Sequence, residues 1–151
     1  MNYRSCFISY SARNQNFADQ LYKDLSNAGV VCWFATESLY ASENFEEKIA
    51  DAIRSFDRFV VLISKQSLNS TWVAREISIA LDQEQQRANF VLPIILDNAF
   101  ENAKKIWVKK LKAKHIIDFK TRGQSQYYFE ALRKLLTALE SEDSASTDTA
   151  E

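Results

Sequence analysis

Short apolar stretches alternate with stretches of helical periodicity along most of this chain. The clearest apolar stretch is "RFVVLIS" (58–64), and four others have the same strand-like character: 5–11, 30–34, 90–96 and 115–119. Apolar residues at helical spacing lie between them and after the last one, at 17–25, 45–56, 77–81 and 129–139. Alternation of this kind favours right-handed βαβ units and a parallel sheet. We therefore predict an α/β, flavodoxin-like, doubly wound fold with about five parallel strands and helices on both faces.

Two of the predicted strands have features that bear on their place in the sheet. The stretch "VVCWF" (30–34) is apolar throughout, which is typical of a strand covered on both faces. Pro93 interrupts the stretch "FVLPIIL" (90–96). Proline has no N–H to donate to a neighbouring strand, so it favours an edge strand or a bulge there.

The 151 residues are enough for one domain, which we place at 1–140. Five of the 20 acidic residues lie in the last twelve positions, which contain no basic residue. We expect 141–151 to be a disordered acidic tail, because it has too few apolar residues to offset the entropy lost on ordering. Cys6 and Cys32 lie in apolar stretches without metal-ligand spacing, so we expect buried, reduced thiols. With neither a membrane-spanning stretch nor a signal peptide in the sequence, we expect a cytoplasmic protein.

Composition argues against several classes of function. Gly29 and Gly123 are the only glycines, which excludes a glycine-rich phosphate loop. The single histidine, His115, has no nucleophile or acid partner and no ligand cluster around it, so we expect neither a catalytic triad nor a metal site. The basic stretch 104–114 could bind nucleic acid, but its apolar residues have packing positions, so we favour a solvated or protein-contacting surface.

In a doubly wound sheet, ligands bind beyond the carboxyl ends of the strands. The segments to search are therefore 9–14, 35–44, 64–76 and 97–104. The third contains the start of "STWVAREISIALDQE" (70–84), an amphipathic helix that Ser70 or Thr71 could cap, with Glu76 near its beginning. Taken alone, this carboxylate could simply interact favourably with the helix dipole.

Four segments carry a family resemblance when read in order: "CFISYSARN", "VVCWFATESL", "FEEKIADAIRSFDRFVVLISKQSLNSTWVAREISIAL" and "FVLPIILD". From about residue 4 to 97 they resemble a TIR (Toll/interleukin-receptor) domain, and bacterial stand-alone TIR proteins in particular. The resemblance implies the same five-stranded fold. It also implies one of two activities: cleavage of NAD at its nicotinamide–ribose bond, or non-enzymatic assembly with like domains as a signalling scaffold.

In the enzymatic members the catalytic residue is the glutamate of a W-V-x-x-E segment, which is Glu76 here. The resemblance further implies NAD as a substrate rather than a cofactor, no metal, and head-to-tail packing of TIR domains that completes the site. It suggests a role in prokaryotic defence or signalling, with a separate sensor or effector protein as partner. The product, linear or cyclic ADP-ribose, stays open.

Around Glu76 we expect further substrate-binding residues from three segments. Arg13 has a planar guanidinium that could clamp a pyrophosphate, and Trp72 could either wall a pocket or belong to the core. In full, the candidates are Tyr10, Ser11, Arg13, Phe34, Glu37 and Trp72. The chemistry is reasonable in itself, because loss of nicotinamide builds positive charge on the ribose, which a nearby carboxylate stabilises.

Overall fold

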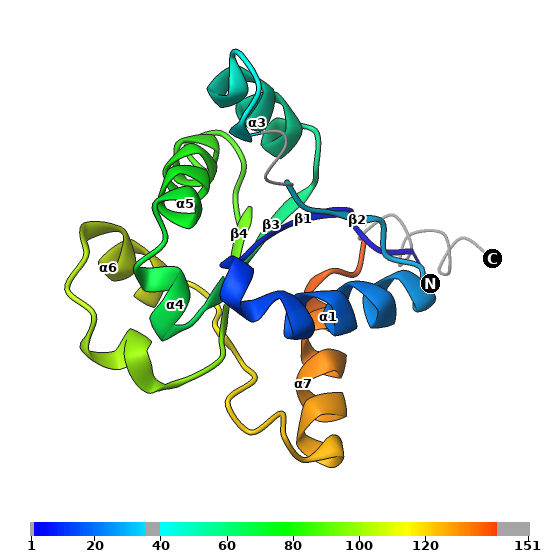
Figure 1. Ribbon diagram of the computed structural model, residues 1–151. Helices are drawn as coiled ribbons and strands as arrows, with labels where there is room; N and C mark the ends of the chain where they lie inside the picture. The colour runs from blue at the N-terminus through cyan, green and yellow to red at the C-terminus, as the bar shows by residue number, and fades with distance from the viewer. Residues whose placement is uncertain (1, 36–39, 142–151) are drawn as a thin grey trace.

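The described residues, 2–35 and 40–141, form an α/β structure in the computed structural model (Figure 1). The five strands of the sheet are β1 (Cys6–Ser9), β2 (Cys32–Trp33), β3 (Arg58–Ile63), β4 (Val91–Ile95) and β5 (Ile117–Asp118). They are all parallel and lie in the order β2-β1-β3-β4-β5. The predicted fold class is confirmed.

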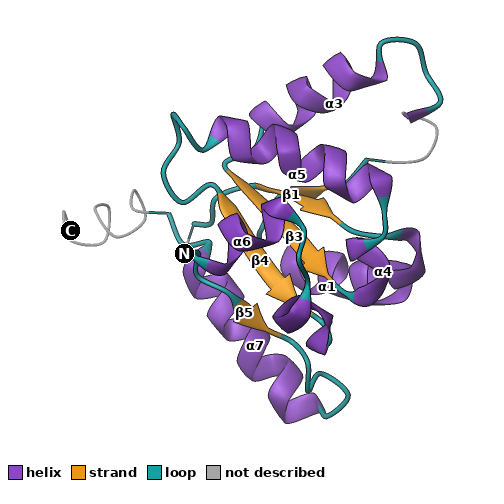
Figure 2. Ribbon diagram, turned by 90° about the vertical axis from the view of Figure 1, so that its left-hand side faces the viewer, coloured by secondary structure: helices purple, strands orange, loops and turns teal. Residues whose placement is uncertain are grey.

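Helices cover both faces of this sheet (Figures 1 and 2). The α-helices whose bounds lie within the described residues are α1 (Gln15–Asn27), α3 (Phe45–Arg54), α4 (Lys65–Leu68), α5 (Thr71–Gln83), α6 (Ile106–Lys112) and α7 (Ser125–Ala138). Two 3-10 helices, η1 (Ala12–Asn14) and η2 (Asn98–Asn102), follow β1 and β4. None of the helices in the described ranges is long and apolar enough to cross a membrane.

Alternation of side chains along the strands divides the core into two layers. Ile8 of β1 and Leu62 of β3 pack with α1 and α7, whereas Phe7 and Ile63 pack with α3, α5 and α6. Ile8 is 1% exposed and the other three are fully buried. Both faces of the central strands β1 and β3 are therefore covered, which leaves the strand ends as the place where a ligand can approach them.

The strand β2 differs from the prediction. It contains two paired residues and lies at the edge of the sheet rather than in a position covered on both faces. Val31 beside it is 68% exposed and Trp33 is 36% exposed. An unbroken apolar stretch does not by itself show two-sided burial, because an edge strand can leave such side chains at the surface.

The prediction for Pro93 was also wrong, because β4 is an interior strand with β3 on one side and β5 on the other. Leu96 N–H donates to Ile63 of β3, and the Ile95 carbonyl accepts from Phe119 beside β5. Since successive residues face opposite neighbours, the Pro93 nitrogen faces β5. The pairing with β5 begins only at Ile94, so no ladder hydrogen bond is lost.

The end of α1 has a well-defined cap. Gly29 has φ +101°, in the left-handed region. Its N–H donates to the Ser26 carbonyl at 3.0 Å, and the Val30 N–H donates to the Leu25 carbonyl at 2.9 Å. This is a Schellman motif, and it turns the chain directly into β2.

Three smaller expectations complete the comparison. Cys6 and Cys32 are free and buried, as predicted, and their sulfurs lie 3.5 Å apart on neighbouring strands. Phe129 and Ile106, both assigned to packing positions, are instead 57% and 79% exposed. The domain limit at 140 stays a prediction, because all of the proposed tail except Ser141 lies outside the described residues.

Candidate active site

The polar segments that follow β1 and β3 meet at the carboxyl ends of these two neighbouring strands. From β1 the chain proceeds to β2 on one side, and from β3 it proceeds to β4 on the other. This is the topological switch point, where doubly wound sheets bind their ligands. Ser64, directly after β3, donates a 2.7 Å hydrogen bond from Oγ to Asn14 Oδ1, which ties the two segments together.

Glu76 lies in the second turn of α5 and points into this junction. The helix begins where predicted, with the Ser70 hydroxyl accepting from Val73 N–H at 3.2 Å. Val73, Ile77 and Ala80 bury one side of the helix, and Glu76 on the same side is only 4% exposed. A carboxylate this deep needs hydrogen-bond partners to offset its lost hydration.

One hydroxyl group meets that need directly, and a second lies beside the carboxylate. Ser9, the fully buried last residue of β1, donates from Oγ to Glu76 Oε1 at 2.8 Å. The Tyr40 hydroxyl lies close enough to lower the pKa of Glu76, and its own hydrogen bond goes to the Trp72 carbonyl at 3.5 Å. The carboxylate is therefore held from the sheet and flanked by the segment before α3.

The surroundings of Glu76 shift its protonation toward neutral pH. Burial raises the pKa of Glu76 to about 7, although the hydroxyl groups of Ser9 and Tyr40 act in the opposite direction. Burial raises the pKa of Tyr40 as well, and the nearby Glu76 charge adds to that effect. A carboxyl group that titrates near neutral pH in a ligand-binding position is typical of functional sites.

An aromatic pair stands beside the carboxylate. The rings of Tyr40 and Trp72 stack with centroids 4.3 Å apart and an angle of 9° between planes. Trp72 is 39% exposed, so it is a surface wall and the alternative of a core tryptophan is wrong. The pair gives the junction a flat aromatic surface of the kind on which a nucleobase or pyridine ring can stack.

A cavity of about 610 Å³ lies next to Trp72. It contains four of the six predicted substrate-binding residues: Tyr10, Ser11, Arg13 and Trp72. A second cavity, of about 430 Å³, lies on the Tyr40 side of Trp72 and includes Arg75. Trp72 thus lines both spaces, one turn of helix before Glu76.

The other two predicted residues do not join this group. Phe34 is half-buried and packs edge-to-face against Tyr10 at 5.2 Å and Tyr22 at 5.6 Å. It therefore supports the ring of Tyr10 and does not line the 610 Å³ cavity. Glu37 lies outside the described residues.

The structure adds three residues that the sequence analysis missed: Ser9, Tyr40 and Lys65. Ser9 and Tyr40 contact Glu76, and Lys65 lines the 610 Å³ cavity. All three lie within the post-strand segments selected for search, and that position is the one signal the sequence gives, although it does not single them out from their neighbours. No group of three potential metal ligands occurs among the described residues.

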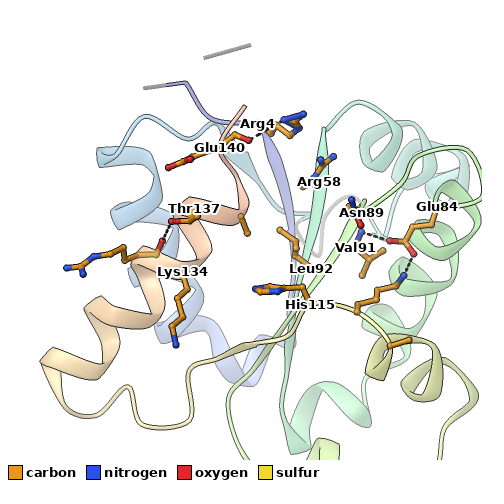
Figure 3. Close-up of a pocket in the computed structure, with 14 residues that line it drawn as sticks. Arg4, Arg58, Glu84, Asn89, Val91, Leu92, His115, Lys134, Thr137 and Glu140 are labelled. Atoms are coloured by element: carbon orange, nitrogen blue, oxygen red, sulfur yellow. Dashed lines mark hydrogen bonds and ion pairs between the residues drawn. The ribbon is translucent and has the colours of Figure 1, made fainter. Parts of the chain in front are cut away.

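A larger cavity, about 890 Å³, lies at the amino ends of the strands, opposite the carboxyl ends (Figure 3). Arg58 and Val91 at the starts of β3 and β4 line it, together with His115 before β5 and residues from the end of α7. Glu84 there pairs with Lys114 and accepts from Val91 N–H at 2.8 Å. None of the predicted site residues lines this cavity. The volume of a cavity therefore does not by itself identify the active site.

Comparison with known proteins identifies the family and the fold. A profile of the TIR domain family matches residues 6–136. The stimulator of interferon genes protein of Magallana gigas is 32% identical over 92 residues, which are 60% of this chain and 22% of that protein. The chain thus spans about a fifth of the length of this curated relative.

Solved structures share the fold at lower identity. The TIR domain of the Toll-related receptor TRR-2 from Hydra magnipapillata is 16% identical, with a TM-score of 0.60 over 87% of this chain and 97% of that one. A prokaryotic SEFIR domain is 17% identical, with a TM-score of 0.58 over 86% and 90%. The TIR domains of the activated Roq1 resistosome are 21% identical, with a TM-score of 0.52 over 90% and 84%. From the family match over most of its length, together with this fold, we conclude that the chain belongs to the TIR domain family.

Proposed function

We propose that this TIR domain cleaves the nicotinamide–ribose bond of NAD, with Glu76 as the catalytic carboxylate. The observation that carries the proposal is the buried Glu76, held by Ser9 at the switch point beside Trp72 and the 610 Å³ cavity. No neighbouring cation neutralises Glu76 among the described residues, since Arg75 pairs with Glu46 at 2.7 Å. The carboxylate is therefore available to stabilise a positive charge that develops in the substrate.

The chemistry needs little beyond this group. As the bond between C1′ of the ribose and the pyridine nitrogen breaks, both electrons go to the nitrogen and neutral nicotinamide leaves. No general acid is required, because the leaving group begins as a cation. The ribose acquires oxocarbenium character, which the ionised Glu76 stabilises electrostatically. Water then adds its oxygen to C1′, and one proton is released as ADP-ribose forms.

Access to Glu76 requires a change at Tyr40. Glu76 lines neither of the cavities beside Trp72, and Tyr40 contacts both the carboxylate and the Trp72 ring. We propose that self-association opens and completes the site. The similarity to TIR domains within an activated resistosome supports this part of the proposal. A separate sensor or effector would then trigger a cytoplasmic defence or signalling response of prokaryotic type.

Because Glu76 lines neither cavity beside Trp72, a second candidate function is also favoured: a non-enzymatic scaffold that assembles with like domains. In that case Glu76 would only complete the buried hydrogen-bond network, and Tyr40 would never leave it. The two functions differ in one measurable quantity, the turnover of NAD by assembled protein.

The test is incubation of the purified protein with NAD at high protein concentration, with products identified by chromatography and mass spectrometry. We expect nicotinamide release that rises more than linearly with protein concentration. Glu76→Gln should abolish it while leaving the circular dichroism spectrum unchanged. Full turnover by a folded Glu76→Ala variant would overturn the assignment, and lack of turnover by protein shown to be assembled would favour the scaffold.

A further inference from the structure

Two basic side chains face the 610 Å³ cavity without a negatively charged partner. Arg13 lies in η1, after β1, and Lys65 is the first residue of α4, after β3. The remaining residues around this cavity are neutral, and six of them carry hydroxyl or amide groups that can donate hydrogen bonds: Tyr10, Ser11, Gln66, Asn69, Ser70 and Thr71. No aspartate or glutamate lines it among the described residues.

Several other basic side chains of the described residues have partners, and those without one, such as Lys23 and Lys104, lie outside this cavity. Arg54, Arg75, Lys114 and Lys120 form ion pairs, and Arg87 and Arg122 donate to backbone carbonyls. Within the described ranges, neither the Arg13 guanidinium nor the Lys65 ammonium takes part in an ion pair. Two unpaired cations in a concave space without carboxylates create a positive potential there, which attracts an anion of matching charge.

The backbone that carries these side chains is fixed. The Lys65 N–H donates to Asp97 Oδ2 at 2.9 Å, and the Arg13 N–H donates to Ser11 Oγ at 3.3 Å. The hydrogen bond between Ser64 and Asn14, each adjacent to one of the two basic residues, joins the segments. The spacing of the two cations is therefore set by the fold, which is a requirement for selecting one ligand over another.

We propose that Arg13 and Lys65 form a two-cation subsite for the diphosphate of a dinucleotide. This inference rests on the proposed function, and it adds Lys65 as a specificity-determining residue. Trp72 closes the cavity on the side of Glu76, so the nicotinamide ribose lies toward Trp72 and the diphosphate toward Arg13 and Lys65. Guanidinium suits two phosphate oxygens at once, and the ammonium supplies a second point charge.

The subsite predicts discrimination between substrates that share the reacting bond but differ in phosphate. NAD carries a diphosphate, nicotinamide mononucleotide a single phosphate, and nicotinamide riboside none. Lys65→Gln and Arg13→Gln should each lower the ratio of kcat/KM for NAD over nicotinamide riboside by about tenfold, the size expected when one hydrogen bond to a charged group is lost. The mononucleotide should give a smaller change. Lys104→Gln, an exposed lysine outside the cavity, is the matched control and should leave the ratio unchanged.

Equal losses for NAD and nicotinamide riboside, or no loss for either, would overturn the subsite. If the wild-type protein cleaves no substrate, calorimetric titration with ADP-ribose decides the question separately from catalysis. Binding that both variants weaken about tenfold, and that Lys104→Gln leaves unchanged, supports the subsite even though the proposed function has failed. Absence of ADP-ribose binding, or binding that the variants do not alter, contradicts it.

Discussion

Ionisation of the buried Glu76 carboxylate lowers the free energy of unfolding of the protein. The Ser9 hydroxyl donates to it and the Tyr40 hydroxyl lies beside it, but no cation contacts it among the described residues. Its pKa of about 7 lies above the 4.5 of an unperturbed glutamate. The folded protein therefore binds more protons than the unfolded chain between these values, and the free energy of unfolding falls as the pH rises through this range. Above pH 7 the full penalty is present.

Glu76→Gln should remove this penalty. The amide keeps an acceptor oxygen for Ser9 and stays neutral at every pH. We expect the variant to exceed the wild type in unfolding free energy by about 3 kcal/mol at pH 8, with the difference shrinking toward zero near pH 4. Urea denaturation at several pH values measures it. Glu130→Gln, at an exposed position, should show no such pH-dependent gain, and a constant difference for Glu76→Gln would contradict the argument.

The residues of the candidate site differ in how far the sequence reveals them. Glu76, Arg13 and Trp72 follow strands in recognisable segments, so their place at the strand ends could be predicted. Ser9 is part of a strand, and nothing in the sequence shows which face it takes opposite α5. The contact between Tyr40 and Trp72 joins segments 32 residues apart, and local periodicity carries no information about such a pair. Lys65 lies in a four-residue helix, too short to give a periodic signal.

At the scale of elements, the boundaries follow local chemistry closely. Ser70 caps α5 as the sequence indicated, and Gly29 ends α1 in a Schellman motif. The errors in helices are limited to exposed Phe129 and Ile106, while those in β2 and β4 concern the place of a whole strand, which depends on its neighbours. An apolar stretch or a proline gives information on the local conformation of a strand. The position of that strand in the sheet is decided by its pairing with residues far away in the sequence. Element type was therefore predictable, but the order of strands followed only from the fold class.

Gly29→Ala tests the capping of α1. Nothing lies within 4 Å of a Cβ atom added there, so the substitution introduces backbone strain at φ +101° without a clash. We expect a loss of about 1 kcal/mol in unfolding free energy. Gly123 offers the matched control, since it is equally open and has no left-handed φ. Gly123→Ala should therefore cost less, and an equal loss at both positions would show that φ at Gly29 is not responsible.

At the scale of the whole molecule, the sheet separates two apolar layers. Ile8 belongs to the layer with α1 and α7, and Ile53 to the layer with α3 and α5. Both side chains are almost completely buried, and they belong to separate clusters of packed residues. The layers nevertheless share every strand, so we expect them to unfold in one cooperative transition.

Ile8→Val and Ile53→Val should each lower the unfolding free energy by about 1 kcal/mol. The double variant should lose the sum to within about 0.5 kcal/mol, because the two sites have no common partner. Chemical denaturation followed by circular dichroism gives these values. A clear departure from additivity in the double variant would show that the two sites interact. Unfolding in two steps would show that the two layers do not unfold cooperatively.

The stacked pair of Tyr40 and Trp72 has an optical consequence. An indole ring stacked on a phenol and left partly open to water has an emission that depends on its neighbour. Any ligand that displaces Tyr40 replaces that neighbour with its own ring or with solvent, and the fluorescence of Trp72 changes with it. The protein thus carries an intrinsic probe one helical turn from Glu76, through which occupancy of the site becomes visible without a label and without turnover.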